Sequence, residues 1–220
     1  MSSMIAPTEF WKKVNIGPTI KVYADKYSDF NHLWEDCDRA DFMLWLLQRL
    51  EYKNANKLWE VYKEIRVTSK RKLPDKQLTN FTQDIDFFFN NYKKDLRDSI
   101  TKQHQTIESA KENYLSNAFL YIELALREAI EDAVFSAKFN AGVDARFKKV
   151  NIVTSEDGKI ISKNVLTEAD EKEINEIRKK AAEKTQLDLY KKYAEVFRQV
   201  IGNPFLPKNQ IDFERIPDFD

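Results

Sequence analysis

The sequence contains few of the residues that interrupt helices or cross-link chains. Among its 220 residues are four Gly, six Pro and one Cys. A single cysteine excludes an intramolecular disulfide, and with two His it supplies too few ligands for a structural zinc site. The shortage of Gly and Pro favours long helices over short strands joined by turns. We therefore expect no metal and no cofactor, and a reducing cytoplasm as the location.

The sequence also lacks an excess of one charge and any long apolar run. Its 36 basic and 36 acidic side chains cancel, which argues against nucleic acid as a partner. The basic run around Arg66 and Lys70–Lys72 has no interleaved aromatic residues and is interpreted as a solvated loop. No window approaches the roughly 20 apolar residues of a membrane span, so we expect no membrane partner.

What the sequence does contain is apolar residues at helical spacing. Phe81, Ile85, Phe88, Tyr92 and Leu96 recur every three or four positions, as do residues between Leu115 and Ala137 and between Leu187 and Ile201. This pattern predicts an all-α multi-helix bundle with long helices. A continuous helix from 91 to 140 would be longer than the domain needs, so we expect a bend within 101–106, and we expect Gly142 to end the helix.

One segment departs from the helical pattern. Residues 148–165 contain β-branched runs on either side of Asp157-Gly158, which predicts a short β-hairpin inserted in the bundle. Thr167 and Asp170 are spaced to cap the helix that follows. The predicted organisation is an irregular N-terminal arm at 1–26, a helical domain at 27–202 that includes the hairpin, and an extended C-terminal tail at 203–220.

The usual catalytic and cofactor motifs are absent from the sequence. There is no Gly-rich phosphate loop, zinc-protease helix or nucleophile elbow. Glu123, Glu128, Glu131 and Asp132 lack the Glu-x-x-His partner of a di-metal site and are interpreted as a solvated face. Cys37 is interpreted as a buried structural thiol because His32 lies one and a half helical turns away. We therefore do not expect an enzyme.

The candidate partner-binding residues lie outside the predicted helical stripes. Two adjacent rings in the arm, the hairpin and the aromatic tail are the places where side chains or strand edges could meet another protein. These residues are Phe10, Trp11, Ile152, Asp157, Ile160, Phe205 and Phe213.

Two short motifs resemble a known family. The run Trp34-Glu-Asp-Cys-Asp-Arg-Ala-Asp-Phe-Met-Leu-Trp-Leu-Leu47 is similar to an element of helical immunity proteins from bacteria and phages, and Gly202-Asn-Pro-Phe-Leu-Pro207 is similar to the tail of such proteins. Phe42 stands where that family has Trp, and Leu206 stands where it has Arg. The resemblance implies an all-helical fold and a role in neutralising a toxin.

These observations lead to one expectation of function and one alternative. The expectation is a non-enzymatic helical protein-binding module, an immunity protein of bacterial or phage origin that binds a toxin. The alternative is a structural or assembly protein of a phage or mobile element, in which long helices and the two ends of the chain provide contacts for a homo-oligomer. An enzyme with an unfamiliar site would instead require several perturbed carboxylates in a polar cleft.

Overall fold

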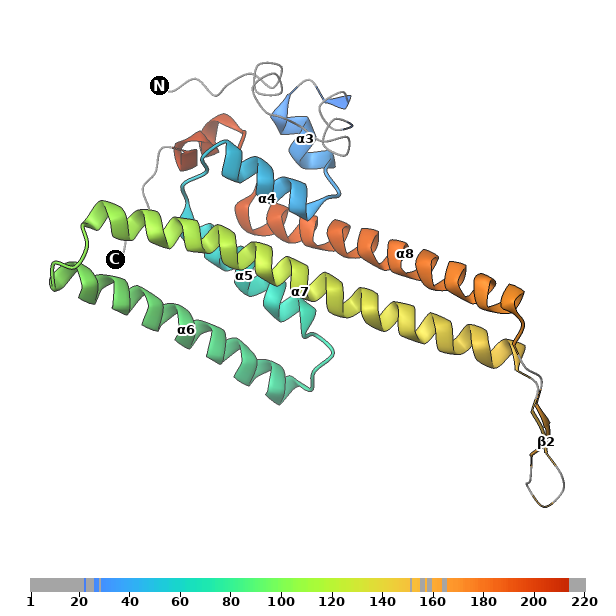
Figure 1. The fold of residues 1–220 in the computed structure, drawn as a ribbon. Coiled ribbons are helices and arrows are strands. Elements are labelled where there is room, and N and C mark those ends of the chain that lie inside the picture. The colour runs from blue at the N-terminus through green and yellow to red at the C-terminus, as the bar shows by residue number, and fades with distance from the viewer. Residues whose placement is uncertain are drawn as a thin grey trace. The chain divides into compact units, whose positions relative to one another are not determined.

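The computed structural model describes residues 22, 26, 27, 29–150, 152–154, 157, 160–163 and 166–213. This part of the chain is all-α apart from one β-hairpin, as the helical spacing predicted (Figure 1). The helices are α3 (Phe30–Asp36), α4 (Ala40–Arg49), α5 (Ala55–Ser69), α6 (Asp75–Thr101), α7 (Ile107–Lys149) and α8 (Glu168–Ile201). The hairpin consists of β1 (Ile152–Thr154) and β2 (Ile160–Lys163), and a 3-10 helix, η1, covers Pro207–Phe213.

Short polar side chains start several of these helices. The carboxylate of Asp29 accepts the His32 amide at the start of α3, and the Asn54 side chain accepts the Lys57 amide at the start of α5. At α8 the Thr167 amide donates to Asp170 Oδ2 at 2.9 Å, and the Asp170 amide donates to Thr167 Oγ1 at 3.2 Å. The predicted capping pair of Thr167 and Asp170 is therefore confirmed.

The long helical stretch is interrupted where a bend was predicted. The chain leaves α6 at Thr101 and begins α7 at Ile107, and Gln103 between them has a φ of 58°. The Thr106 hydroxyl accepts the Ser109 amide at 3.1 Å and caps α7. The five residues 102–106, which include no Gly or Pro, thus reverse the chain because local caps satisfy the helix ends.

The prediction that Gly142 ends the long helix is wrong. The helix α7 continues through Gly142 to Lys149, and of the described glycines Gly202 has a positive φ. A Cβ built on Gly142 would lie 2.0 Å from Nε of Arg178 in α8. Gly142 therefore provides room for the Arg178 side chain. The helix that ends at a left-handed glycine is α8, where Gly202 has a φ of 74°.

The chain divides into two compact units, and the helical domain predicted over 27–202 contributes to both. Unit 1 contains residues 1–126 and 190–220, and unit 2 contains residues 127–189. The predicted domain contributes to both units because α7 and α8 are long enough to extend into both. Unit 2 therefore consists of one stretch of α7, the β-hairpin and one stretch of α8.

Unit 1 contains a core of large apolar side chains. The helix α4 is buried over most of its circumference because residues 42–47 are all apolar, although Trp45 is half-buried. Two further tryptophans, Trp34 and Trp59, lie in the core and are 0% and 3% exposed. The helix α6 is more exposed than its stripe suggested: Ile85 and Leu96 are buried, but Phe88 is 36% exposed.

Candidate functional site

The predicted hairpin is present at the predicted place. The strands β1 and β2 pair antiparallel, with Ile152 opposite Lys163 and a shift in register at Thr154. Figure 1 shows the two strands extending beyond the ends of α7 and α8. Asp157 lies in the turn and is exposed, whereas only the backbone of Ile152 and Ile160 is described. Phe10 and Trp11, the candidates in the arm, lie outside the described residues.

The two candidates in the tail pack against other aromatic rings of unit 1. Phe205 is 6% exposed, and its ring centroid lies 5.3 Å from that of Phe30 and 5.8 Å from that of Trp34. Phe213 is half-buried, with its centroid 5.6 Å from that of Tyr52. Both rings are occupied by contacts within the chain. The interpretation of Phe205 as a partner contact therefore has to be corrected, since its surface is already covered.

The described part of the tail is also not extended. Residues 207–213 form η1, and Asp212 is 7% exposed. Asn54 donates to Asp212 Oδ1 at 3.1 Å, Lys57 Nζ lies 3.4 Å from Oδ2, and the Lys53 amide donates to the Asp212 carbonyl at 3.0 Å. A buried carboxylate is stable when its hydrogen bonds and charge are compensated in this way. Asp212 therefore anchors the tail to the start of α5.

The two motifs that resemble immunity proteins form one structural junction. The Trp34 indole Nε1 donates to the Gly202 carbonyl at 2.8 Å, and the Trp34 ring meets Phe197 edge-on at 6.4 Å. Arg198 donates to the Cys37 carbonyl at 2.7 Å, so the cation satisfies the end of α3. Residues separated by 168 positions in sequence are thus in direct contact. We name the contacts of Trp34 with Phe197, Gly202 and Phe205 the tryptophan junction.

Cys37 lies beside the tryptophan junction, and its thiol is buried and protonated. The thiol is 0% exposed and donates to the Arg39 carbonyl at 3.5 Å. Burial raises the pKa of Cys37 to about 12, so the thiol is protonated at neutral pH. His32 is turned to another partner, because its Nδ1 lies 2.5 Å from Asp29 Oδ2. The prediction of a buried structural thiol is confirmed.

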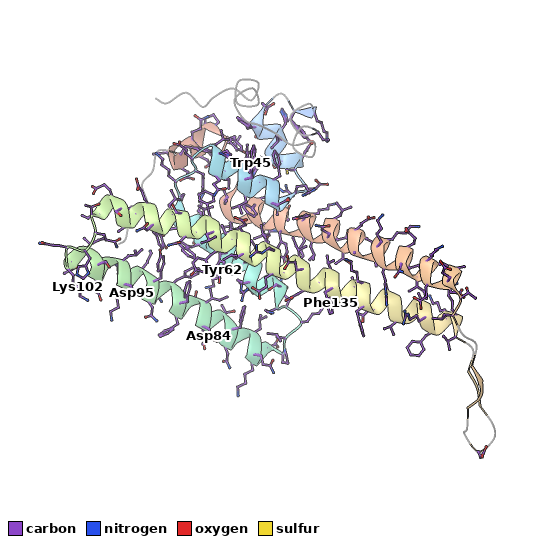
Figure 2. The ribbon with its side chains drawn as sticks, viewed as in Figure 1. Trp45, Tyr62, Asp84, Asp95, Lys102 and Phe135 are labelled. Atoms are coloured by element: carbon purple, nitrogen blue, oxygen red, sulfur yellow. The ribbon has the colours of Figure 1, made fainter. Side chains whose placement is uncertain are left out.

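A second aromatic cluster, whose members come from separate predicted helices, surrounds Trp59. The Trp59 ring lies 4.6 Å from Phe89, 5.5 Å from Tyr114 and 5.4 Å from Tyr121, measured between centroids. These rings come from α5, α6 and α7, and Figure 2 shows Tyr62 among these helices. Among the described residues no acceptor pairs with the buried indole Nε1 of Trp59. The cluster therefore holds three helices together by ring contacts rather than by a polar bond from the indole.

Charged side chains clamp the base of the hairpin in unit 2. Lys149 Nζ, at the end of α7, lies 2.8 Å from Asp170 Oδ1 and 2.8 Å from Glu173 Oε2 in α8. One turn earlier, Arg146 Nη2 lies 2.9 Å from both carboxylate oxygens of Glu171. The hairpin enters from Lys149 and returns at the start of α8. These ion pairs, which we call the hairpin clamp, therefore fix the two points from which the hairpin projects.

The stability that the hairpin clamp contributes is expected to depend on pH through the carboxyl group of Asp170. Lys149 and the Thr167 cap hold the pKa of Asp170 well below its usual range. The stability contributed by a carboxyl with a lowered folded pKa is present above its unfolded pKa of about 3.9 and is lost as the pH falls toward the folded pKa. The contribution of Asp170 should thus be complete at neutral pH and diminish below about pH 4.

We therefore expect D170N to lower the thermal midpoint at neutral pH, and the difference from the wild type to shrink as the pH is lowered through about 4 toward 3. Thermal unfolding followed by far-UV circular dichroism measures this difference. D144N, an exposed carboxyl on α7, provides the matched control and should leave the midpoint unchanged. A constant difference between D170N and the wild type at every pH would contradict the role assigned to Asp170.

Unit 2 also exposes large apolar side chains. Phe135, Phe139 and Phe147 of α7 are 72%, 60% and 74% exposed, and Val143 between them is half-buried. Figure 2 shows Phe135 pointing away from α8. We name Phe135, Phe139, Val143 and Phe147 the phenylalanine ladder. Contiguous exposed apolar patches of sufficient area mark interaction sites on many proteins.

Neither a metal cluster nor a membrane helix is found in the part of the chain that the structure describes. No group of three or more His, Cys, Asp or Glu side chains is arranged there to hold a metal ion. Glu123, Glu128, Glu131 and Asp132 are all exposed on α7. None of the described helices is both long enough and apolar enough to cross a bilayer.

The chain matches no protein-family model, no curated protein and no solved structure. Its resemblance to immunity proteins therefore rests on the two short motifs, and arguments about function rest on the hairpin, its clamp and the exposed face of α7.

Proposed function

We propose that this chain is a non-enzymatic protein-binding module that engages one protein partner through its β-hairpin. The observation that carries the proposal is the position of β1 and β2, which extend beyond α7 and α8 from a base fixed by the hairpin clamp. A two-stranded ribbon is marginally stable by itself, and it gains backbone hydrogen bonds when a strand of another protein adds to its edge. The hairpin is therefore suited to strand addition.

The two motifs similar to immunity proteins supply the proposed biological role. In this role the chain neutralises a bacterial toxin by binding it one-to-one and covering its working surface. The tryptophan junction accounts for these motifs as parts of a scaffold, because Trp34 and Phe205 are buried against each other. Under this proposal the scaffold is shared with such proteins, and the hairpin selects the partner.

The test is to purify the tagged full chain from the bacterium that carries its gene and to compare three forms. These are the wild type, a variant in which residues 151–165 are replaced by a flexible Gly-Ser linker, and F87A. The last removes an exposed ring of α6 in unit 1, which is 69% exposed, and serves as the matched control. One dominant protein should be retained by the wild type and F87A and lost from the linker variant.

The retained protein should then be toxic when expressed alone and harmless when expressed with this chain in equal amount. Retention of the same partner by the linker variant would overturn the assignment of the hairpin. Recovery of no stoichiometric partner under several growth conditions would overturn the proposal of a protein-binding module as a whole.

The phenylalanine ladder favours a second candidate, an assembly protein of a phage or mobile element. Such a protein would use exposed apolar faces to bind further copies of itself in a ring or filament. Size-exclusion chromatography with light scattering separates the two candidates. A large homo-oligomer would favour the assembly protein, whereas a monomer or dimer would favour the binding module.

A further inference from the structure

We propose that Asp157 is a site of spontaneous covalent modification, at which the turn of the hairpin converts to isoaspartate through a cyclic succinimide. Asp157 is exposed and lies in the turn between β1 and β2. It is the one aspartate of the sequence that is followed by a glycine, Gly158. A glycine carries no Cβ that would hinder the approach of its amide nitrogen to the preceding side chain. This proposal is independent of the function assigned to the hairpin.

The reaction needs no reagent other than water. The amide nitrogen of Gly158 forms a bond to Cγ of Asp157, and one carboxyl oxygen leaves as water, taking up the amide proton. Water then opens the five-membered ring at one of its two carbonyl carbons. Attack at Cγ restores aspartate, whereas attack at the main-chain carbonyl carbon leaves the chain running through Cγ, which is isoaspartate. The water lost in the first step is regained in the second, and no atom changes its oxidation state.

The fold makes Asp157 more reactive than the aspartates that lie in helices. Asp98, Asp132 and Asp144 also precede a small residue, Ser or Ala, but they lie within α6 or α7. Ring closure there requires the backbone to leave its helical angles and the next amide to leave its bond to the carbonyl four residues earlier. Asp132 and Asp144 are as exposed as Asp157, so the backbone decides the difference. A two-stranded ribbon is marginally stable, so the rotation at Asp157 costs less.

Isomerisation changes the hairpin and leaves the helices as they are. The route through Cγ adds one atom to the main chain within residues 155–159, which join β1 to β2. Thr154 and Ile160, the pair next to the turn, are therefore the first part of the ladder that the change reaches. The ion pair between Lys149 and Asp170 lies at the other end of the hairpin and is retained.

Ageing the full chain at neutral pH in water enriched in heavy oxygen tests the proposal, because each ring opening leaves one heavy oxygen atom at the reacting residue. Trypsin in ordinary water then releases residues 150–159, which contain one aspartate, and residues 128–138 of α7, which contain only Asp132. The first peptide should gain label at residue 157 and separate into two forms of equal mass, and the second should stay unlabelled. No label at residue 157, or equal labelling of both peptides, would overturn the proposal.

Three variants test the chemistry. G158A places a Cβ beside the attacking nitrogen and should slow labelling at least about tenfold, which is a barrier higher by about 1.4 kcal/mol. D157E keeps the carboxylate but would need a six-membered ring, so labelling at residue 157 should cease. D157N reaches the same succinimide from an uncharged side chain and should react faster than the wild type. Labelling of G158A at the wild-type rate, continued labelling of D157E, or slower reaction of D157N would each contradict the proposal.

Discussion

Replacing Trp34 by Ala is expected to lower the free energy of unfolding by about 3–5 kcal/mol. Trp34 is 0% exposed, and its removal would leave Phe197 and Phe205 facing a cavity and the Gly202 carbonyl without its donor. A loss of this size is a large share of the stability of a typical domain. Chemical denaturation followed by far-UV circular dichroism measures it.

The conservative variant W34F separates the effect of the cavity from the effect of the lost hydrogen bond to Gly202. It keeps a ring in the junction but removes the indole N–H, so it should cost about 1–3 kcal/mol for the part-buried Gly202 carbonyl left without its donor. If W34A and W34F both unfold like the wild type, Trp34 does not stabilise the contact between α3 and the C-terminal segment. The resemblance of the two motifs to immunity proteins would then need another explanation.

Replacing Trp59 by Ala is expected to have a similarly large effect, again about 3–5 kcal/mol. The ring is 3% exposed and touches side chains from α6 and α7, so its removal would loosen three helices together. The same denaturation experiment measures it.

The variant W59F should behave differently from W34F. No acceptor among the described residues pairs with the Trp59 indole, so a phenylalanine removes a buried donor without breaking a hydrogen bond. We expect W59F to cost less than about 1.5 kcal/mol and less than W34F. A larger loss for W59F than for W34F would show that the indole of Trp59 has a bond that the structure does not contain.

The parts of the fold that could be predicted are those determined by neighbouring residues. The Thr167–Asp170 cap depends on residues three positions apart, and the hairpin depends on β-branched runs around Asp157. The break between α6 and α7 was expected at 101–106 because an unbroken helix would have been too long for the domain. In each case the feature is determined by residues close together in the sequence or by the length of one helix, and both can be read from the sequence.

The parts that were missed depend on long-range contacts. Phe205 follows Pro204 in a segment without periodicity, so its burial against Trp34 could not be read from its own neighbours. Glycine often ends a helix, but the helix continues through Gly142 because good helix formers surround it. A glycine at this position also leaves space for the Arg178 side chain. The division into two units has no marker in the sequence, because α7 and α8 each contribute residues to both.

The candidate site shows the same limit. The hairpin was found from sequence, but its clamp was not, because Lys149 and Glu173 are 24 residues apart and their charges resemble those of any solvated helix. The phenylalanine ladder was missed for a related reason. Rings at helical spacing usually indicate a core, and only the structure shows that Phe135 and Phe147 are exposed.

The central claim is that the two ends of the described chain are joined through Trp34 and Phe205, and a double-mutant cycle of W34A and F205A measures this contact most directly. Rings in contact at 5.8 Å should show a coupling of about 0.5–1.5 kcal/mol or more in the free energy of unfolding, so the double variant should lose less than the sum of the single losses. Losses that add within about 0.3 kcal/mol would contradict the junction.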